Sequence, residues 1–346
     1  MKKKTWIFII AATLVLLVVI ILLILNSFFK PVKKTDGSIP YNENNLYTLY
    51  NGCFLEFSED GMVTQYSVVD IKDPSIIKRD FPRINLPVKK YISWNLFITE
   101  DDEIMFGDII ENEHKKLGTV KNAANIRTRR DREGTLLRTA VITTDGLLFV
   151  QGDNSTGALG IEEKQINDGF VHVPNLQNVV DAVFGIDCIF VLNADGEVFL
   201  SGTWGELSYK TFTKLEIPEK VKDITGSLIS GTLIALGVDG NVYEMGVSYF
   251  QNIYYNESTV HTGSFYSTFQ KISRLKNIVS VTVHGTTAYA IDNDGKVFYW
   301  GSEMKGNSSK LTKVFKRVCG IPKADAVWRG DYLYILNNNE ITAYDW

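Results

Sequence analysis

A short turn pattern occurs seven times along the chain, and this repeat constrains the fold more than any other feature. An Asp-Gly pair, with an apolar residue two positions after the glycine, occurs at residues 60–61, 145–146, 195–196, 239–240 and 294–295. Two degenerate copies carry Asp102 and Asn339 at the glycine position. With the second turn residue as the anchor, the seven anchors are separated by 41, 44, 50, 44, 55 and 44 residues. Self-similarity at this period is typical of β-propellers.

Each anchor lies between two runs that have strand periodicity. The positions six before, four before and two after the anchor are apolar in all seven copies. The column four residues before the anchor consists of Phe57, Ile98, Ile142, Leu192, Leu236, Ile291 and Ile335. Such alternation indicates strands with one buried face. Because Asp-Gly tolerates positive φ at both central turn positions, each anchor is predicted to close a β-hairpin.

The rest of each unit supplies further strands. A β-branched run ending near a glycine precedes each of several hairpins, as in "NVVDAVFG" and "NIVSVTVHG", and another short strand precedes that run. Three to four strands in about 44 residues fit one propeller blade. Seven units from about residue 38 to residue 346 therefore predict an all-β, seven-bladed β-propeller. A net charge of −4 gives no reason to expect a nucleic-acid partner.

One unit resembles a known repeat. The run "GDNSTGALG" at residues 152–160, after "DGLLFVQ", is similar to the end of the regulator of chromosome condensation repeat, and eroded copies occur as "SGTWGELS" and "YWGSEMKGN". The resemblance implies a seven-bladed propeller and identifies the chain as a divergent, bacterial-type member. The histidine usual in that repeat, eight residues before the anchor, is absent in all seven units. The nucleotide exchange and chromatin binding of the eukaryotic member are therefore not expected here. A phosphate-binding loop is disfavoured at 152–160, since the glycine spacing matches neither nucleotide motif.

The N-terminus predicts a membrane anchor. Residues 6–25 are apolar except for Thr13, which is long enough to cross the hydrocarbon core as a single transmembrane helix. The following "NSFFKPVKK" has no small-residue cleavage site, which favours an uncleaved signal anchor over a cleavable signal peptide. Three lysines and the α-amino group on the N-terminal side, against three lysines on the other, favour a cytoplasmic N-terminus. We therefore expect a single-pass plasma-membrane protein with its propeller outside the cytoplasm, at the cell surface.

These features divide the chain into three parts. Residues 1–29 are predicted to form the cytoplasmic tip and the transmembrane anchor, residues 30–45 a polar stalk, and residues 46–346 the propeller.

The third unit departs from the repeat by its arginines. In place of an apolar strand it has "NIRTRRDREG", with Arg127, Arg129, Arg130 and Arg132, and Arg138 follows in the next strand. One interpretation is a solvated edge with Asp131 and Glu133 as partners. The other is a binding patch for anions, because clustered guanidinium groups favour carboxylate or phosphate.

The longest interval, between the anchors at 240 and 295, contains an aromatic insertion. Residues 247–269 include Tyr249, Phe250, Tyr254, Tyr255, Phe265, Tyr266 and Phe269. These rings either pack beneath the loop or form an exposed surface of the kind enriched in protein interfaces.

No catalytic constellation is visible in the sequence. The four histidines fall in four different units without ligand spacing, and no nucleophile elbow or zinc-protease motif occurs. We therefore expect no cofactor, no metal and no catalysis, and a propeller that binds another protein or envelope component through one face. The alternatives are an envelope enzyme or carbohydrate-acting protein with a site built from loops, and an enzyme inhibitor, since the resembled family includes an inhibitor of β-lactamases.

Overall fold

The computed structural model describes most of the chain beyond residue 32. It covers residues 33–50, 53–59, 61–69, 75–81, 86–93, 95–108, 113–131, 133–227, 231–247, 255–256, 259–260, 265–305, 308–330 and 332–345. No helix within these ranges has the length and apolarity needed to cross a membrane. The transmembrane segment predicted at residues 6–25 lies outside the described residues.

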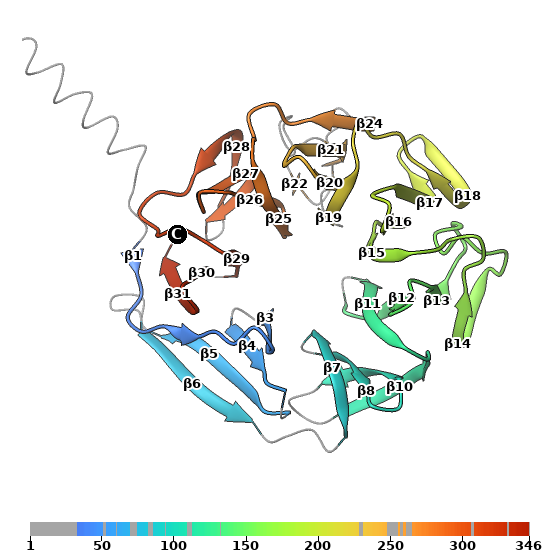
Figure 1. Ribbon diagram of the computed structural model, residues 1–346, viewed down its shortest axis with the longest axis horizontal. Helices are drawn as coiled ribbons and strands as arrows, with labels where there is room; N and C mark the ends of the chain where they lie inside the picture. The colour runs from blue at the N-terminus through green and yellow to red at the C-terminus, as the bar shows by residue number, and fades with distance from the viewer. Residues whose placement is uncertain are drawn as a thin grey trace, which may run out of the picture.

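Seven antiparallel sheets form a closed ring, and each has its first strand nearest the centre (Figure 1). Blade 1 holds β3 (Leu46–Tyr50), β4 (Cys53–Phe57), β5 (Val63–Val69) and β6 (Ser75–Phe81); blade 2 holds β7 (Val88–Ser93), β8 (Leu96–Thr99), β9 (Glu103–Asp108) and β10 (Glu113–Thr119). Blade 3 holds β11 (Ala123–Arg130), β12 (Leu136–Thr143), β13 (Leu148–Asp153) and β14 (Gln165–His172); blade 4 holds β15 (Val179–Phe184), β16 (Asp187–Asn193), β17 (Val198–Trp204) and β18 (Leu207–Lys214).

The remaining three blades follow the same order. Blade 5 holds β19 (Val221–Ser227), β20 (Thr232–Gly237), β21 (Val242–Val247) and β24 (Phe265–Lys271); blade 6 holds β25 (Ile278–His284), β26 (Thr287–Asp292), β27 (Val297–Lys305) and β28 (Ser308–Arg317). Blade 7 holds β29 (Ala326–Arg329), β30 (Leu333–Asn337) and β31 (Glu340–Asp345), completed by β1 (Lys33–Lys34) and β2 (Ile39–Pro40). The predicted all-β, seven-bladed propeller is confirmed.

The seven anchors lie in the turns between the second and third strands. All seven have left-handed backbone, with φ between +59° and +85°, including the degenerate Asp102 and Asn339. Among the hairpins whose two turn positions are both described, the expectation of positive φ at both positions is correct for the last one, where Asn338 also has φ of +49°. In the other described turns only the anchor is left-handed, and Gly146 N donates to Thr143 O at 3.0 Å. This is a right-handed turn closed by one left-handed residue, a common hairpin form that needs positive φ at a single position.

The anchors also connect neighbouring blades. The carbonyl of Gly146 accepts a 2.9 Å hydrogen bond from Val179 N, at the start of the next blade. The carbonyls of Asp102, Gly196, Gly240 and Gly295 accept equivalent bonds of 3.1, 2.9, 3.0 and 2.8 Å. A Cβ at Gly146 would lie 2.7 Å from Asn178 Cα, so a larger residue would push the blades apart. The repeated glycine therefore serves both the hairpin and the contact between blades.

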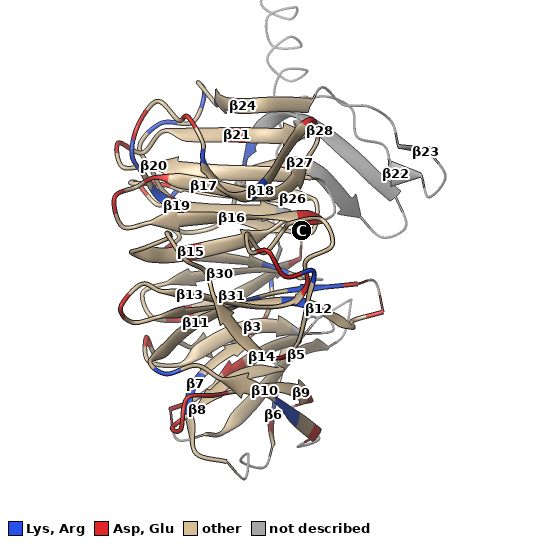
Figure 2. Cartoon of the chain, turned by 90° about the vertical axis from the view of Figure 1, so that its right-hand side faces the viewer, with Lys and Arg blue, Asp and Glu red and all other residues tan. Residues whose placement is uncertain are grey.

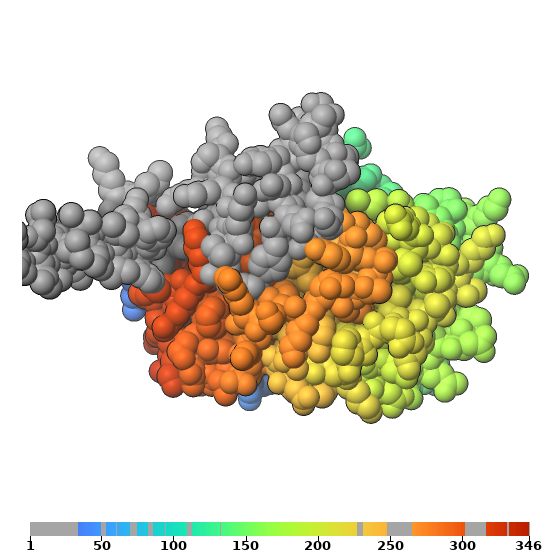
Figure 3. All heavy atoms as spheres, turned by 90° about the horizontal axis from the view of Figure 1, so that it is seen from above, coloured from blue at the N-terminus to red at the C-terminus, as the bar shows by residue number. Residues whose placement is uncertain are grey.

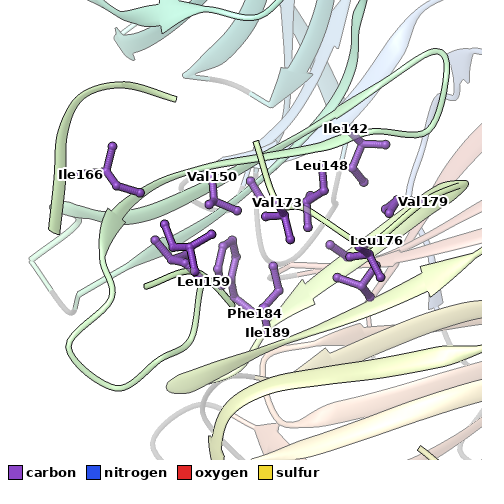
Figure 4. Packing of buried hydrophobic residues seen from close by; sticks show 14 residues of the cluster. Ile142, Leu148, Val150, Leu159, Ile166, Val173, Leu176, Val179, Phe184 and Ile189 are labelled. Carbon is purple, nitrogen blue, oxygen red and sulfur yellow. The ribbon is translucent and has the colours of Figure 1, made fainter. Parts of the chain in front are cut away.

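The hydrophobic core lies between adjacent blades, which follow one another around the rim in Figure 3. In Figure 4, Leu148 and Val150 of blade 3 and Phe184 and Ile189 of blade 4 belong to one cluster of fourteen buried residues. Leu159, from the β13–β14 connection, is fully buried beside them. Burial of such side chains contributes about 1.5–3 kcal/mol each, so each pair of blades is held mainly by apolar contact.

The ring is closed by the N-terminal segment. Lys33 lies opposite Asp345 and Pro40 opposite Glu340, so β1 and β2 together supply the outer strand of blade 7. This corrects the expectation of a polar stalk over residues 30–45 and a propeller starting at residue 46, because residues 33–34 and 39–40 already belong to the sheet. Pairing of the two ends of the chain removes the sheet edges that an open ring would expose.

Two further contacts hold this segment. The N–H and the hydroxyl of Thr35 both donate to Ala343 O, at 3.0 and 2.9 Å. Ile39 is fully buried and packs against Phe54 and Tyr334. The closing segment therefore contributes buried apolar surface as well as backbone pairing.

Candidate functional site

The ring has two faces that differ in their connections. The seven anchor turns lie on one face, here called the turn face; the opposite one, the loop face, holds the β11–β12 turn and the ends of β21 and β24. Figure 2 shows the ring edge-on, with the C-terminal end of the chain on the side opposite the anchor turns. The arginine segment and the aromatic insertion, which both depart from the repeat, therefore extend beyond their sheets on the loop face.

Most of the predicted arginines lie on β11, the innermost strand of blade 3. Arg127 forms an ion pair with Asp181 of β15, with 2.7 Å between Nη2 and Oδ1. Arg130 donates to Asn95 Oδ1 at 2.6 Å and lies over the Phe106 ring, 4.8 Å from its centroid. These two residues thus join blade 3 to blade 4 on one side and to blade 2 on the other.

Arg138 has a similar structural role. It is 3% exposed, donates from Nη1 to Ile186 O of blade 4 at 2.7 Å and forms an ion pair with Asp153 at 3.1 Å. A buried guanidinium of this kind is stable only with such partners.

Among the described arginines of this segment, Arg129 has the fewest partners. Its Nη1 donates to the Arg130 carbonyl, whereas its buried Nε has no hydrogen-bond partner. Burial and the nearby Arg138 guanidinium lower its pKa from the ordinary value, and Asp187 and Asp131 act in the opposite direction. An acidic group of a ligand would satisfy this guanidinium. Arg132 lies outside the described residues.

A pair of carboxyl groups lies beside Arg127 near the centre of the ring. Asp181 of β15 and Asp223 of β19 are both half-buried. Burial, and secondly the Asp181 carboxylate, raise the pKa of Asp223 to about 6, while Arg127 acts against this shift. No local sequence pattern marks this pair. The two aspartates follow a β-bulge in their strands, but the number of residues from them to the anchor differs between blades, which hides their equivalence.

This pKa shift predicts how stability depends on pH. Because the folded protein binds the Asp223 proton more tightly than the unfolded chain, Asp223 favours folding less as pH rises from about 4 to about 6. We expect Asp223→Asn to raise the melting temperature by about 3 °C at pH 8 and by much less at pH 4. Thermal unfolding at both pH values measures the difference. Asp239→Asn, at an exposed anchor turn, is the control, and an equal gain at both pH values would contradict the assignment.

The described part of the aromatic insertion is largely packed. The Phe265 ring lies on Gly205, where an added Cβ would be 2.3 Å from Phe265 Cζ. The centroids of the Phe265 and Trp204 rings are 6.1 Å apart. Phe269 is 8% exposed, and Tyr266 is half-buried.

The rest of the insertion gives less information. Tyr249, Phe250 and Tyr254 lie outside the described residues, and only the backbone of Tyr255 is described, in β22 (Tyr255–Asn256), which pairs with β23 (Thr259–Val260). Packing beneath the loop therefore accounts for Phe265 and Phe269, and a binding role for the other rings stays a prediction.

The family-like run at residues 152–160 is a contact between blades. It forms the end of β13 and the β13–β14 connection, and Ser201 Oγ of blade 4 donates to Gly157 O at 2.8 Å. Asn154 is 5% exposed; its Nδ2 donates to Ile161 O and to a second carbonyl, both at 2.8 Å, and its Oδ1 accepts from Leu159 N at 2.7 Å. Leu159 and Ala158 are fully buried, so protein side chains occupy the space beneath this loop.

The described histidines are separate from one another. His114 packs against Phe97, and His172 against Phe149. His284 is half-buried, and the loss of hydration lowers its pKa to about 4. Across the described ranges, no three His, Cys, Asp or Glu residues are grouped to hold a metal ion.

Comparison with solved structures identifies the architecture. Prp20p from Saccharomyces cerevisiae aligns with a TM-score of 0.56 and 15% identity over 86% of this chain and 81% of that chain. The fold is that of an RCC1-like propeller. Human WBSCR16 aligns with a TM-score of 0.55 and 16% identity over 77% of this chain and 78% of that chain.

The RCC1-like fold agrees with the resemblance at residues 152–160. The same yeast protein, described as RCC1 (Prp20) and bound to Kap60, aligns with a TM-score of 0.56 and 15% identity over 86% of this chain and 79% of that chain. No family model matches the sequence.

Proposed function

We propose that this chain is a membrane-anchored, extracytoplasmic propeller that binds another protein through its loop face, without catalysis of its own. The observation that carries the proposal is that both departures from the repeat open on this face. Loops on a rigid scaffold tolerate such changes without disturbing the core and commonly carry recognition.

The RCC1-like fold supports a binding role. Prp20p is described with binding properties to Gsp1p and histones, and the yeast protein has been captured with Kap60. Those partners belong to the yeast protein, and only the use of the fold as a protein-binding scaffold is carried over here. The apolar run at residues 6–25 supports the anchor, and the lysine distribution around it supports the extracytoplasmic orientation.

A matched pair of arginine variants tests the binding role. Arg129→Gln removes the charge of the guanidinium whose Nε has no hydrogen-bond partner, so we expect at least tenfold weaker partner binding and a melting temperature within about 2 °C of the parent. Arg127→Gln breaks the ion pair with Asp181, so we expect a lower melting temperature. Binding is measured with the partner recovered by cross-linking from intact cells. Unchanged binding by Arg129→Gln at unchanged stability would remove this residue from the site.

A further inference from the structure

The closure of the ring fixes the direction from which the N-terminal segment reaches the propeller. Lys33 pairs with Asp345, at the end of β31 farthest from the anchor turn, whereas Pro40 pairs with Glu340 beside that turn. The chain therefore reaches the ring at its loop face and runs along blade 7 toward the turn face.

Hydrogen bonds and buried apolar contacts hold this segment on the ring. Thr35 is hydrogen-bonded to Ala343, and Ile39 is fully buried among residues of blades 1 and 7. Ile76 N of blade 1 donates to Asp36 O at 3.1 Å, so the segment is held by two blades. These contacts fix the point at which the segment enters the ring, at the loop-face end of blade 7.

The tether is short. Only residues 26–32 separate the predicted span from β1. Even fully extended, they and their flanking bonds reach about 28 Å. We infer that the loop face is turned toward the membrane and is a docking surface for a protein embedded in that same membrane. This inference rests on the proposed membrane anchor.

Charge on the opposite face favours the same orientation. Asp145, Asp195 and Asp239 are exposed on the turn face, whereas Asp294 is paired there with Lys296. Anionic lipid headgroups repel such carboxylates and so favour a turn face that points away from the bilayer. A partner within the membrane reaches the loop face directly, while a large soluble protein is hindered by the bilayer.

The full chain in liposomes tests this orientation. Single cysteines replace exposed Glu133 on the loop face or exposed Asp195 on the turn face, in a chain carrying Cys53→Ser and Cys319→Ser. Cys188 is fully buried and stays, because burial raises the pKa of its thiol to about 12. A fluorophore on each cysteine is read against a quencher attached to the lipid headgroups. We expect at least threefold stronger quenching at position 133, and slower reaction of that cysteine with a 20 kDa polyethylene glycol maleimide.

Further measurements distinguish an incorrect orientation from the absence of a membrane anchor. Insertion of twenty Gly-Ser residues between Val32 and Lys33 should reduce the difference in quenching, because the longer tether frees the ring. Equal quenching at positions 133 and 195 in liposome-bound protein would overturn the orientation while leaving the anchor intact. Protein that fails to float with the liposomes would overturn both.

Discussion

A chain that starts at Asn42 is expected to lose most of its stability, whereas a chain that starts at Lys33 keeps it. The shorter chain lacks β1, the Thr35 hydrogen bonds and the buried Ile39 side chain, which together close blade 7. We expect a loss on the order of 5 kcal/mol in the free energy of unfolding, comparable to the whole net stability of an ordinary domain. Denaturant unfolding of the two purified chains measures it.

Point substitutions in the longer chain show which contact matters. Ile39→Ala should cost about 3 kcal/mol, since it empties a fully buried position. Lys34→Ala, at an exposed position of the same segment, should be nearly neutral. Equal stability of the chains that start at Lys33 and at Asn42 would show that closure depends on other contacts.

Asn154→Ala is expected to be the most damaging single substitution in the β13–β14 connection. It removes three hydrogen bonds between a buried amide and the backbone and leaves one N–H and two carbonyls without those partners. Because each buried polar group left unsatisfied costs about 1–3 kcal/mol, we expect a total loss of about 4 kcal/mol.

Two further variants serve as comparisons for Asn154→Ala. Ser155→Ala changes an exposed side chain and should be nearly neutral. Asn154→Asp keeps the acceptor for Leu159 N but sets a carboxylate against two carbonyl oxygens, so it should also destabilise the protein. Thermal unfolding measures all three, and a stable Asn154→Ala protein would contradict the assigned role.

The repeat was predictable because its causes are local. A left-handed residue at each anchor and an apolar residue four positions before it occur in every unit, and the structure places them in equivalent turns and strands. Closure was not predictable in the same way, because β1 and β2 have two residues each and lie outside the repeat. Their pairing with β31 depends on contacts across more than 300 residues.

The contacts of the arginine segment were likewise not predictable from local sequence. The sequence located its charges, but the partners Asp181 and Asn95 come from other blades, which no local pattern connects to it. The aromatic insertion was located by its extra length, whereas the packing of Phe265 on Gly205 follows from the pairing of β21 with β24.

Site-specific photo-cross-linking in intact cells tests the central claim most directly. A photoreactive residue replaces exposed Glu133 or Ser155 on the loop face, or exposed Asp145 or Asp195 on the turn face, in the full-length chain. If the loop face binds the partner, one defined protein adduct forms from positions 133 and 155 and none from 145 and 195. Adducts confined to positions 145 and 195 would place the binding surface on the turn face and contradict the account.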